Sequence, residues 1–97
     1  MKRNKRLALL KVVLSSLIEK GFYKHYKGGI YEVIGFAKHT ETEEQLVIYH
    51  DTKCIVWARP ETMWTEEVDG ELRFKRFIDQ REGRLKFLLY KRFHNKQ

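Results

Sequence analysis

The sequence predicts a mainly β protein, α+β overall, built around a small SH3-like curled sheet or barrel of about five strands. From residue 23 to residue 64, apolar and polar side chains alternate with the period of two that strands require. Gly35 lies inside one of these segments and predicts the bulge or sharp bend by which a small sheet curls. The flanking segments have a helical period, which adds an N-terminal helix and a C-terminal helix.

The N-terminal helix is predicted over residues 7–20. Its apolar residues recur at spacings of three and four and share one face: Leu7, Leu10, Leu14, Leu17 and Ile18. Asn4 can cap its start, and Gly21 can end it. We expect the apolar face to cover the open side of the barrel. Self-association and a membrane surface are the weaker alternatives.

Residues 22–26 lead into a glycine turn at 27–29, and strands are predicted over residues 30–38, 46–50 and 54–59. Pro60 cannot continue a ladder. Residues 59–64 are therefore expected to form a short helical turn that plugs one end of the barrel with Met63 and Trp64. Asp69-Gly70 then predicts a tight hairpin between strands at 65–68 and 72–77.

Beyond Asp79 the pattern fits two structures. Strand spacing would use Leu85, Phe87 and Leu89, and Gly83 weakens a helix that begins at Asp79. Helical spacing accounts for Leu85, Leu88, Leu89 and Phe93. We prefer the helix.

Charge divides the chain, which we expect to be a single domain over residues 1–97, into three parts. The formal charge is +7 over residues 1–27, −7 over residues 28–71 and +7 over residues 72–97. A basic helical extension (1–21) thus precedes a β core (22–77) and a basic C-terminal segment (78–97). Because the β core is acidic, a nucleic-acid track must come from the terminal cations Lys2, Arg3, Lys5, Arg6, Arg84, Lys91 and Arg92. Alternatively, the basic ends lie over the acidic middle of the same fold or of a second copy.

Residues at strand ends and in the first turns are candidates for one ligand-binding pocket, because a small barrel gathers its loops at one rim. They are His25, Lys27, Tyr31, His39, Glu41, Trp57 and Arg59. The aromatic rings among them could stack on a nucleic-acid base, and each stacked base contributes about 1–3 kcal/mol to binding. Arg59 could form two parallel hydrogen bonds to a phosphate. Further rings that could stack are Tyr23, Tyr26, Tyr49 and Trp64.

These candidates also have structural interpretations. Tyr31 and Trp57 are more often core residues in a protein of this size. Arg59 could simply pair with Glu41 or Glu44. Residues 39–41 could cap a turn through the threonine hydroxyl.

The same stretch carries a recurring pattern. It reads Tyr23-x-His25-Tyr26-Lys27-Gly28, Tyr31-x-Val33-Ile34-Gly35-x-Ala37-x-His39-Thr40-Glu41, Glu44, Val47-x-Tyr49, Trp57-x-Arg59-Pro60 and Met63-Trp64. This pattern resembles that of the short bacterial proteins grouped as domain of unknown function family 1653, over about residues 23–77. The resemblance implies a compact, curled β-sheet of the SH3-like kind and no established activity. The basic N-terminal helix and the basic tail depart from that family.

Motifs for metal binding and nucleophilic catalysis are missing. His25, His39 and His50 lie 14 and 11 residues apart, without the close pairs of zinc sites. The chain has no Gly-x-Ser-x-Gly elbow, no Walker loop and no Gly-x-Gly-x-x-Gly turn. We expect no catalytic residue, no metal and no cofactor. A pair of His39 and Glu41 is the one acid–base arrangement left open.

Cys54 is the only cysteine, and it lies in a segment predicted as a strand, which favours a reducing, cytoplasmic compartment. The basic start and apolar run superficially match a secretory signal. Lys11 interrupts that run, however, and no cleavage site follows. A membrane span requires about 20 apolar residues, so we expect no membrane partner.

Together these features favour a non-catalytic module that binds a phosphate-bearing ligand, with RNA or another nucleic acid as the leading class. One alternative is a nucleotide or similar small anion at the barrel rim. Another is a protein interaction module, or a homodimer, that uses the N-terminal helix. An enzyme is the least supported interpretation.

Overall fold

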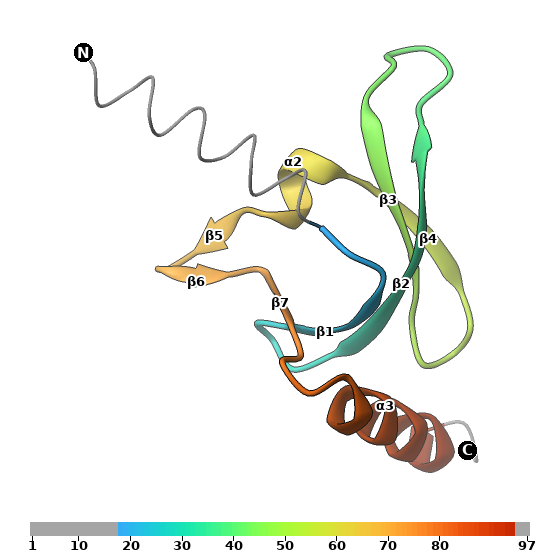
Figure 1. Cartoon of the computed structure of the whole chain (residues 1–97), viewed down its shortest axis with the longest axis vertical. Helices are drawn as coiled ribbons and strands as arrows, with labels where there is room; N and C mark the ends of the chain where they lie inside the picture. Colours follow the sequence, from blue (N-terminus) through green and yellow to red (C-terminus); the bar gives the residue numbers. More distant parts are fainter. Residues whose placement is uncertain (1–17, 95–97) are drawn as a thin grey trace.

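A five-stranded antiparallel sheet organises residues 18–94, the part of the chain that the computed structural model describes (Figure 1). Its strands run in the order β4-β3-β2-β1-β7. One-turn helix α2 (Glu61–Trp64) follows β4, and helix α3 (Gln80–His94) comes last. The strands are β1 (Gly21–His25), β2 (Ile30–Lys38), β3 (Gln45–His50), β4 (Val56–Pro60) and β7 (Phe74–Arg76), and a separate hairpin consists of β5 (Glu67–Val68) and β6 (Glu71–Leu72).

Two local predictions about the backbone are confirmed. The register between β2 and β3 shifts between Val33 and Gly35, which is the predicted bulge. Asp69 and Gly70 both have positive φ, 52° and 84°, as a two-residue hairpin turn requires. That hairpin is short, because β5 and β6 have two residues each.

The predicted barrel needs correction, because the sheet is open. β4 and β7 are its two edges, and no pairing joins them within residues 18–94. β1 (Gly21–His25) overlaps the predicted lead-in at 22–26 and lies between β2 and β7. The end of the predicted 72–77 strand leaves the hairpin and pairs with β1 instead. The pairing of β1 with β7 joins residues about fifty positions apart in the chain, and local alternation does not indicate which strands pair.

The predicted N-terminal helix over residues 7–20 lies almost entirely outside the described residues. Its last three positions, 18–20, are described and are not helical.

The hydrophobic core lies on one side of the sheet, which we call the inner face. Its strand residues are Tyr23, Val33, Val47, Tyr49 and Phe74. Trp64 of α2 closes over them and is 1% exposed, whereas Met63 is 41% exposed. The predicted plug is therefore confirmed for Trp64 and wrong for Met63. Successive residues of a helix point about 100° apart, so a single turn buries only one of them.

The C-terminal helix is confirmed as α3, and it packs on the opposite, outer face of the sheet. The buried ring of Phe87 lies 5.4 Å from the ring of Phe22 and 5.3 Å from that of His50. Gly83 permits this close approach. A Cβ atom at Gly83 would lie 2.8 Å from Phe22 Cβ and from the ring of Phe77.

Two polar side chains fix the start of α3. Asp79 accepts the backbone N–H of Arg81 at 2.9 Å, as an N-cap residue does. The Gln80 side chain accepts the N–H of Phe22 at 2.7 Å and donates to the carbonyl groups of Phe22 and Phe77 at 3.1 and 2.7 Å. The helix is thus anchored to β1 by hydrogen bonds as well as by Phe87.

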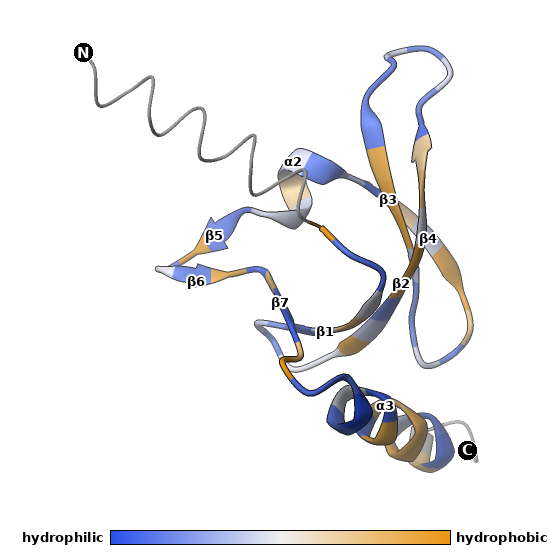
Figure 2. Cartoon of the chain, in the orientation of Figure 1, coloured by the Kyte–Doolittle hydropathy of each residue, from blue (hydrophilic) through white to orange (hydrophobic). Residues whose placement is uncertain are grey.

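Hydropathy follows this architecture. Figure 2 shows apolar stretches in β2 and β3, a hydrophilic β2–β3 loop and hydrophobic residues in the later turns of α3. No helix within residues 18–94 combines the length and apolar character needed to cross a bilayer.

Candidate functional site

Aromatic rings meet on the inner face and form the floor of the candidate site. Trp64 and Phe74 are stacked, with centroids 3.7 Å apart and ring planes 2° apart. Tyr23 and Tyr49 meet Trp64 edge-on at 5.2 and 4.9 Å, and Tyr31 meets Phe74 edge-on at 5.8 Å. The edge-on contacts have the geometry that aromatic pairs prefer. Phe74, the first residue of β7, is therefore packed between α2 and the strands that carry Tyr31 and Tyr49.

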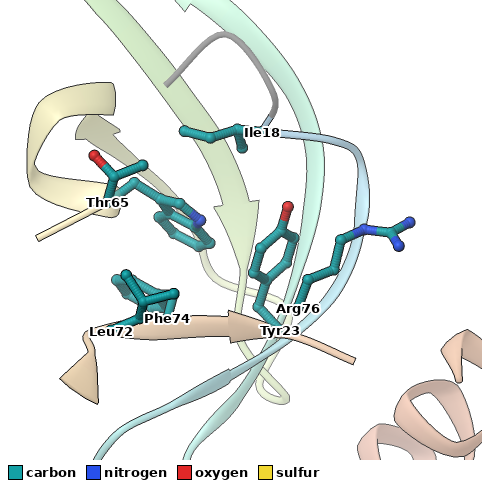
Figure 3. A pocket seen from close by; sticks show the side chains of 7 residues that line it. Ile18, Tyr23, Thr65, Leu72, Phe74 and Arg76 are labelled. Atoms are coloured by element: carbon teal, nitrogen blue, oxygen red, sulfur yellow. The ribbon is translucent and has the colours of Figure 1, made fainter. Parts of the chain in front are cut away.

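A cavity of about 290 Å³ opens beside these rings (Figure 3). Burial raises the pKa of the Tyr23 hydroxyl, and the neighbouring Arg76 side chain opposes this rise. Arg76 also contacts the carbonyl of Lys20 at 3.1 Å and the carboxylate of Glu19 at 3.6 Å. The cavity wall is mostly apolar. Its lining consists of Ile18, Tyr23, Trp64, Thr65, Leu72, Phe74 and Arg76.

A second cavity of about 190 Å³ shares one lining residue, Leu72, with the first. Lys24 and Lys75 are opposite each other in the pairing of β1 with β7, and neither forms an ion pair within the described residues. We call the two cavities together the β7-edge site. The second cavity is lined by Lys24, His25, Tyr26, Glu71, Leu72 and Lys75.

Cationic side chains lie over two rings of this region. Lys27 Nζ and the Arg73 guanidinium lie 5.7 and 5.8 Å from the ring centroid of Tyr26. The Arg59 guanidinium lies 5.4 Å from that of Phe74. These distances fall within the range of cation–π contacts. Both the charge and the rings needed to hold an anionic aromatic ligand are thus present.

His25 is neutral at neutral pH, although it lies among cations. Burial of its ring lowers the pKa of His25 below the ordinary 6.5, and the charges of Arg73, Arg59 and Lys27 lower this pKa further. Its Nδ1 accepts the backbone N–H of Lys27 at 3.1 Å, so the neutral ring carries its proton on Nε2. His25 can therefore donate one hydrogen bond to a ligand but supplies no charge.

Four of the predicted ligand-binding residues come together here. The His25 ring lies 6.2 Å from that of Tyr31 and 4.9 Å from that of Phe74. Lys27 and Arg59 are the cations over the neighbouring rings. Arg59 forms no ion pair with Glu41 or Glu44 among the described residues.

His39 and Glu41 lie in the β2–β3 loop and take no part in the β7-edge site. His39 Nδ1 accepts the N–H groups of Glu41 and Thr42 at 3.1 and 3.2 Å. Thr42 Oγ1 accepts the N–H of Glu44 at 3.3 Å. The expected turn cap therefore exists, but His39 and Thr42 provide it rather than Thr40.

Trp57 lies on β4, at the other edge of the sheet. It is 48% exposed, so it is not a core residue, and its Nε1 donates to Asp51 Oδ2 at 3.0 Å. Burial raises the pKa of Asp51, but hydrogen bonds from Trp57, Ile55 and Lys53 outweigh it and leave this pKa below its ordinary value. Cys54, predicted at the start of this strand, lies exposed in the preceding turn with φ 65°.

The cations predicted to bind nucleic acid divide into two groups. Arg84, Lys91 and Arg92 lie on α3, on the outer face of the sheet, and form no ion pair within residues 18–94. Lys2, Arg3, Lys5 and Arg6 lie outside the described residues.

Sequence reasoning missed four lining residues: Phe74 of the first cavity, Lys24 and Lys75 of the second, and Leu72, which lines both. The alternation around Phe74 indicated a strand there. Only its pairing with β1, which is long-range, brings Lys24 and Lys75 to one place.

Two buried donors remain without a partner in the described part of the chain, Trp64 Nε1 and Arg73 Nε. Buried polar groups of this kind are uncommon in folded proteins.

Across residues 18–94 no three His, Cys, Asp or Glu side chains are grouped to hold a metal ion.

Comparison with known proteins places this fold in a family. The family model described as "Protein of unknown function (DUF1653)" matches residues 21–79. The chain belongs to this family. A crystal structure of a DUF1653 protein from Bordetella bronchiseptica matches with a TM-score of 0.59 and 30% identity, covering 65% of this chain and 91% of that one. The search of curated proteins found no match. The resemblance predicted over residues 23–77 is therefore confirmed.

Proposed function

We propose that this DUF1653 chain is a non-catalytic module that binds nucleic acid, with RNA as the leading class, at the β7-edge site. The observation that carries the proposal is the presence of two cavities that share Leu72 and differ in chemistry. One is lined by rings and apolar groups, and the other carries Lys24 and Lys75. A nucleotide has the same division between a flat base and an anionic phosphate.

Single-stranded RNA suits this arrangement better than a duplex, because its bases are free to leave the stack. Stacking of one base on an aromatic side chain contributes about 1–3 kcal/mol. Tyr26 offers a partly exposed ring beside Lys24, Lys27 and Arg73. Glu71 also lines the second cavity, and its negative charge favours a hydroxyl group of the ligand over a second phosphate at that point.

The terminal cations contribute at longer range. Arg84, Lys91 and Arg92 lie on the outer face, so they act on RNA through their field rather than by contact with the base in the site. Lys2, Arg3, Lys5 and Arg6 belong to the same proposal. Deletion of residues 1–6 is expected to reduce the salt dependence of binding.

The test is the affinity for a fluorescently labelled single-stranded RNA at several salt concentrations. A Lys24→Ala/Lys75→Ala variant is expected to bind at least tenfold more weakly and to lower the slope of log affinity against log salt by about 0.7 for each phosphate that is no longer neutralised. The matched control is Lys38→Ala/Lys53→Ala, which removes two exposed lysines of the acidic middle. Equal losses in both variants, or binding that ignores salt, would contradict the proposal.

A second candidate, a free nucleotide or similar small anion, is favoured by the size of the site. A cavity of about 290 Å³ lies at the lower end of small-ligand pockets and suits one base. Mononucleotides are then expected to raise the melting temperature by mass action, and Arg59→Ala to abolish the shift. Stabilisation by mononucleotides without measurable RNA binding would select this candidate over the first.

The same proposal covers two broader properties. We infer that the bent sheet, with its one-turn helix before the last strands, is of the SH3-like kind. The single cysteine favours a reducing compartment, and we place the protein in the cytoplasm.

A further inference from the structure

Helix α3 presents apolar side chains on two opposite sides. Phe87 faces the sheet and is 4% exposed. A helix advances about 100° per residue, which places a second apolar group on the side away from Phe87. This second group consists of Leu85, Leu88, Leu89 and Phe93, which are 59%, 48%, 45% and 71% exposed, respectively. The sheet therefore leaves a full apolar stripe of α3 uncovered.

The exposed start of β4 lies beside this helix. Ile55 and Val56 are 46% and 59% exposed. Val56 pairs with His50, and the ring of His50 lies 5.3 Å from that of Phe87. β4 is also an edge strand, so its outer backbone groups have no partner strand within the described residues. We call Ile55, Val56 and the α3 stripe together the α3–β4 patch.

The two halves of this patch carry opposite charge. Arg81 and Arg92 lie within the angular range of the stripe, and Arg84, Lys86 and Lys91 lie beside it. Within residues 18–94 only Lys86 among these cations forms an ion pair, with Glu82 at 2.7 Å. The charged groups beside the start of β4 are the carboxylates of Asp51 and Glu32 and one cation, Lys53. Asp51 and Glu32 lie next to Ile55 and to His50.

We propose that the α3–β4 patch is the interface of a two-fold dimer, in which α3 of each copy packs on the start of β4 of the other. Two α3 helices packed together would oppose like charges, whereas α3 against β4 brings cations to acids and covers both apolar groups. Two-fold symmetry makes this contact twice, since residue i meets j and j meets i. Stable interfaces bury about 800 Å² per partner, and two such contacts supply more area than one.

Sedimentation equilibrium over a concentration series tests this dimer. The wild-type chain is expected to associate, and more weakly at high salt. Leu88→Glu and Val56→Glu are each expected to weaken association at least tenfold. Met63→Glu is the matched control, because Met63 has a similar exposure, 41%, but lies on α2 outside the patch. Circular dichroism confirms that each variant is folded.

Mixing the two variants tests the reciprocal arrangement. A dimer of one Leu88→Glu chain and one Val56→Glu chain keeps one α3–β4 contact free of either substitution, whereas each variant alone damages both contacts. Association is therefore expected to recover on mixing, by at least threefold in the dissociation constant. Failure to recover would overturn the proposal. Association that Leu88→Glu weakens and Val56→Glu leaves unchanged would overturn it in favour of α3 packing on α3. A wild-type chain that stays monomeric would also overturn the proposal. The same holds if the chain is monomeric and its α3 stripe binds anionic vesicles.

Discussion

At the scale of single residues, two histidines of the described chain stabilise turns of the backbone. His25 and His39 use the same device, in which Nδ1 accepts the N–H of the residue two positions later. Asn and Asp side chains form turns in the same way. His50 instead hydrogen-bonds Glu32 at 2.8 Å beneath α3. Their spacing in the sequence therefore reflects turns and packing at three separate places.

His25 makes the stability of the fold depend on pH. The folded state holds the pKa of His25 below 6.5, so the unfolded chain takes up the proton first as the pH falls. The stability contributed by the neutral ring is present above pH 6.5 and is lost below it. His25→Asn keeps an acceptor for the Lys27 N–H but does not titrate. Urea unfolding at several pH values between about 7 and 5 is expected to show a steeper loss for the wild type than for this variant.

Equal pH dependence in the two proteins would mean that His25 is as easily protonated in the folded state as in the unfolded one. A variant that lost stability more steeply than the wild type would contradict the sign of the effect.

At the scale of elements, the sequence pattern predicted the features that depend only on residues close together in the chain. The strand at Ile30–Lys38, the bulge at Gly35 and the Asp69-Gly70 turn each depend on neighbouring residues and appear as predicted. β1 was missed because it is short and precedes the glycine turn at 27–29, so residues 22–26 were interpreted as a lead-in to the next strand. The open edge and the β7-edge site escaped prediction because both depend on the pairing of β7 with β1. Strand partners are fixed by tertiary packing and not by period.

The seating of α3 gives a test at this scale. Ala is favoured over Gly inside a helix by about 1 kcal/mol, so Gly83→Ala would stabilise a free helix. Here the added methyl meets Phe22 and Phe77, and overpacking costs about 1–3 kcal/mol. We expect a lower midpoint of urea unfolding for Gly83→Ala. Arg84→Ala is the control at the next, exposed position and should change stability by less than about 0.5 kcal/mol. A Gly83→Ala protein as stable as the wild type would show that α3 is not held close to β1.

At the scale of the whole molecule, the two faces of the sheet carry separate proposals. The cavity lined by aromatic rings opens on the inner face, and the outer face carries α3 and the α3–β4 patch. The sequence indicated a basic C-terminal segment, and four cations of α3 form no ion pair within residues 18–94: Arg81, Arg84, Lys91 and Arg92.

The most direct measurement is a titration of the ¹⁵N-labelled protein with a short single-stranded RNA, followed by NMR. The two tryptophans supply separate probes, because Trp64 lines the cavity of about 290 Å³ and Trp57 lies on β4, the edge strand opposite β7. Saturating RNA is expected to shift the Trp64 indole N–H together with the backbone amides of Tyr26, Leu72 and Lys75, and to leave the Trp57 indole N–H in place. Unchanged signals at these four residues, or shifts confined to Trp57 and α3, would contradict binding at the β7-edge site.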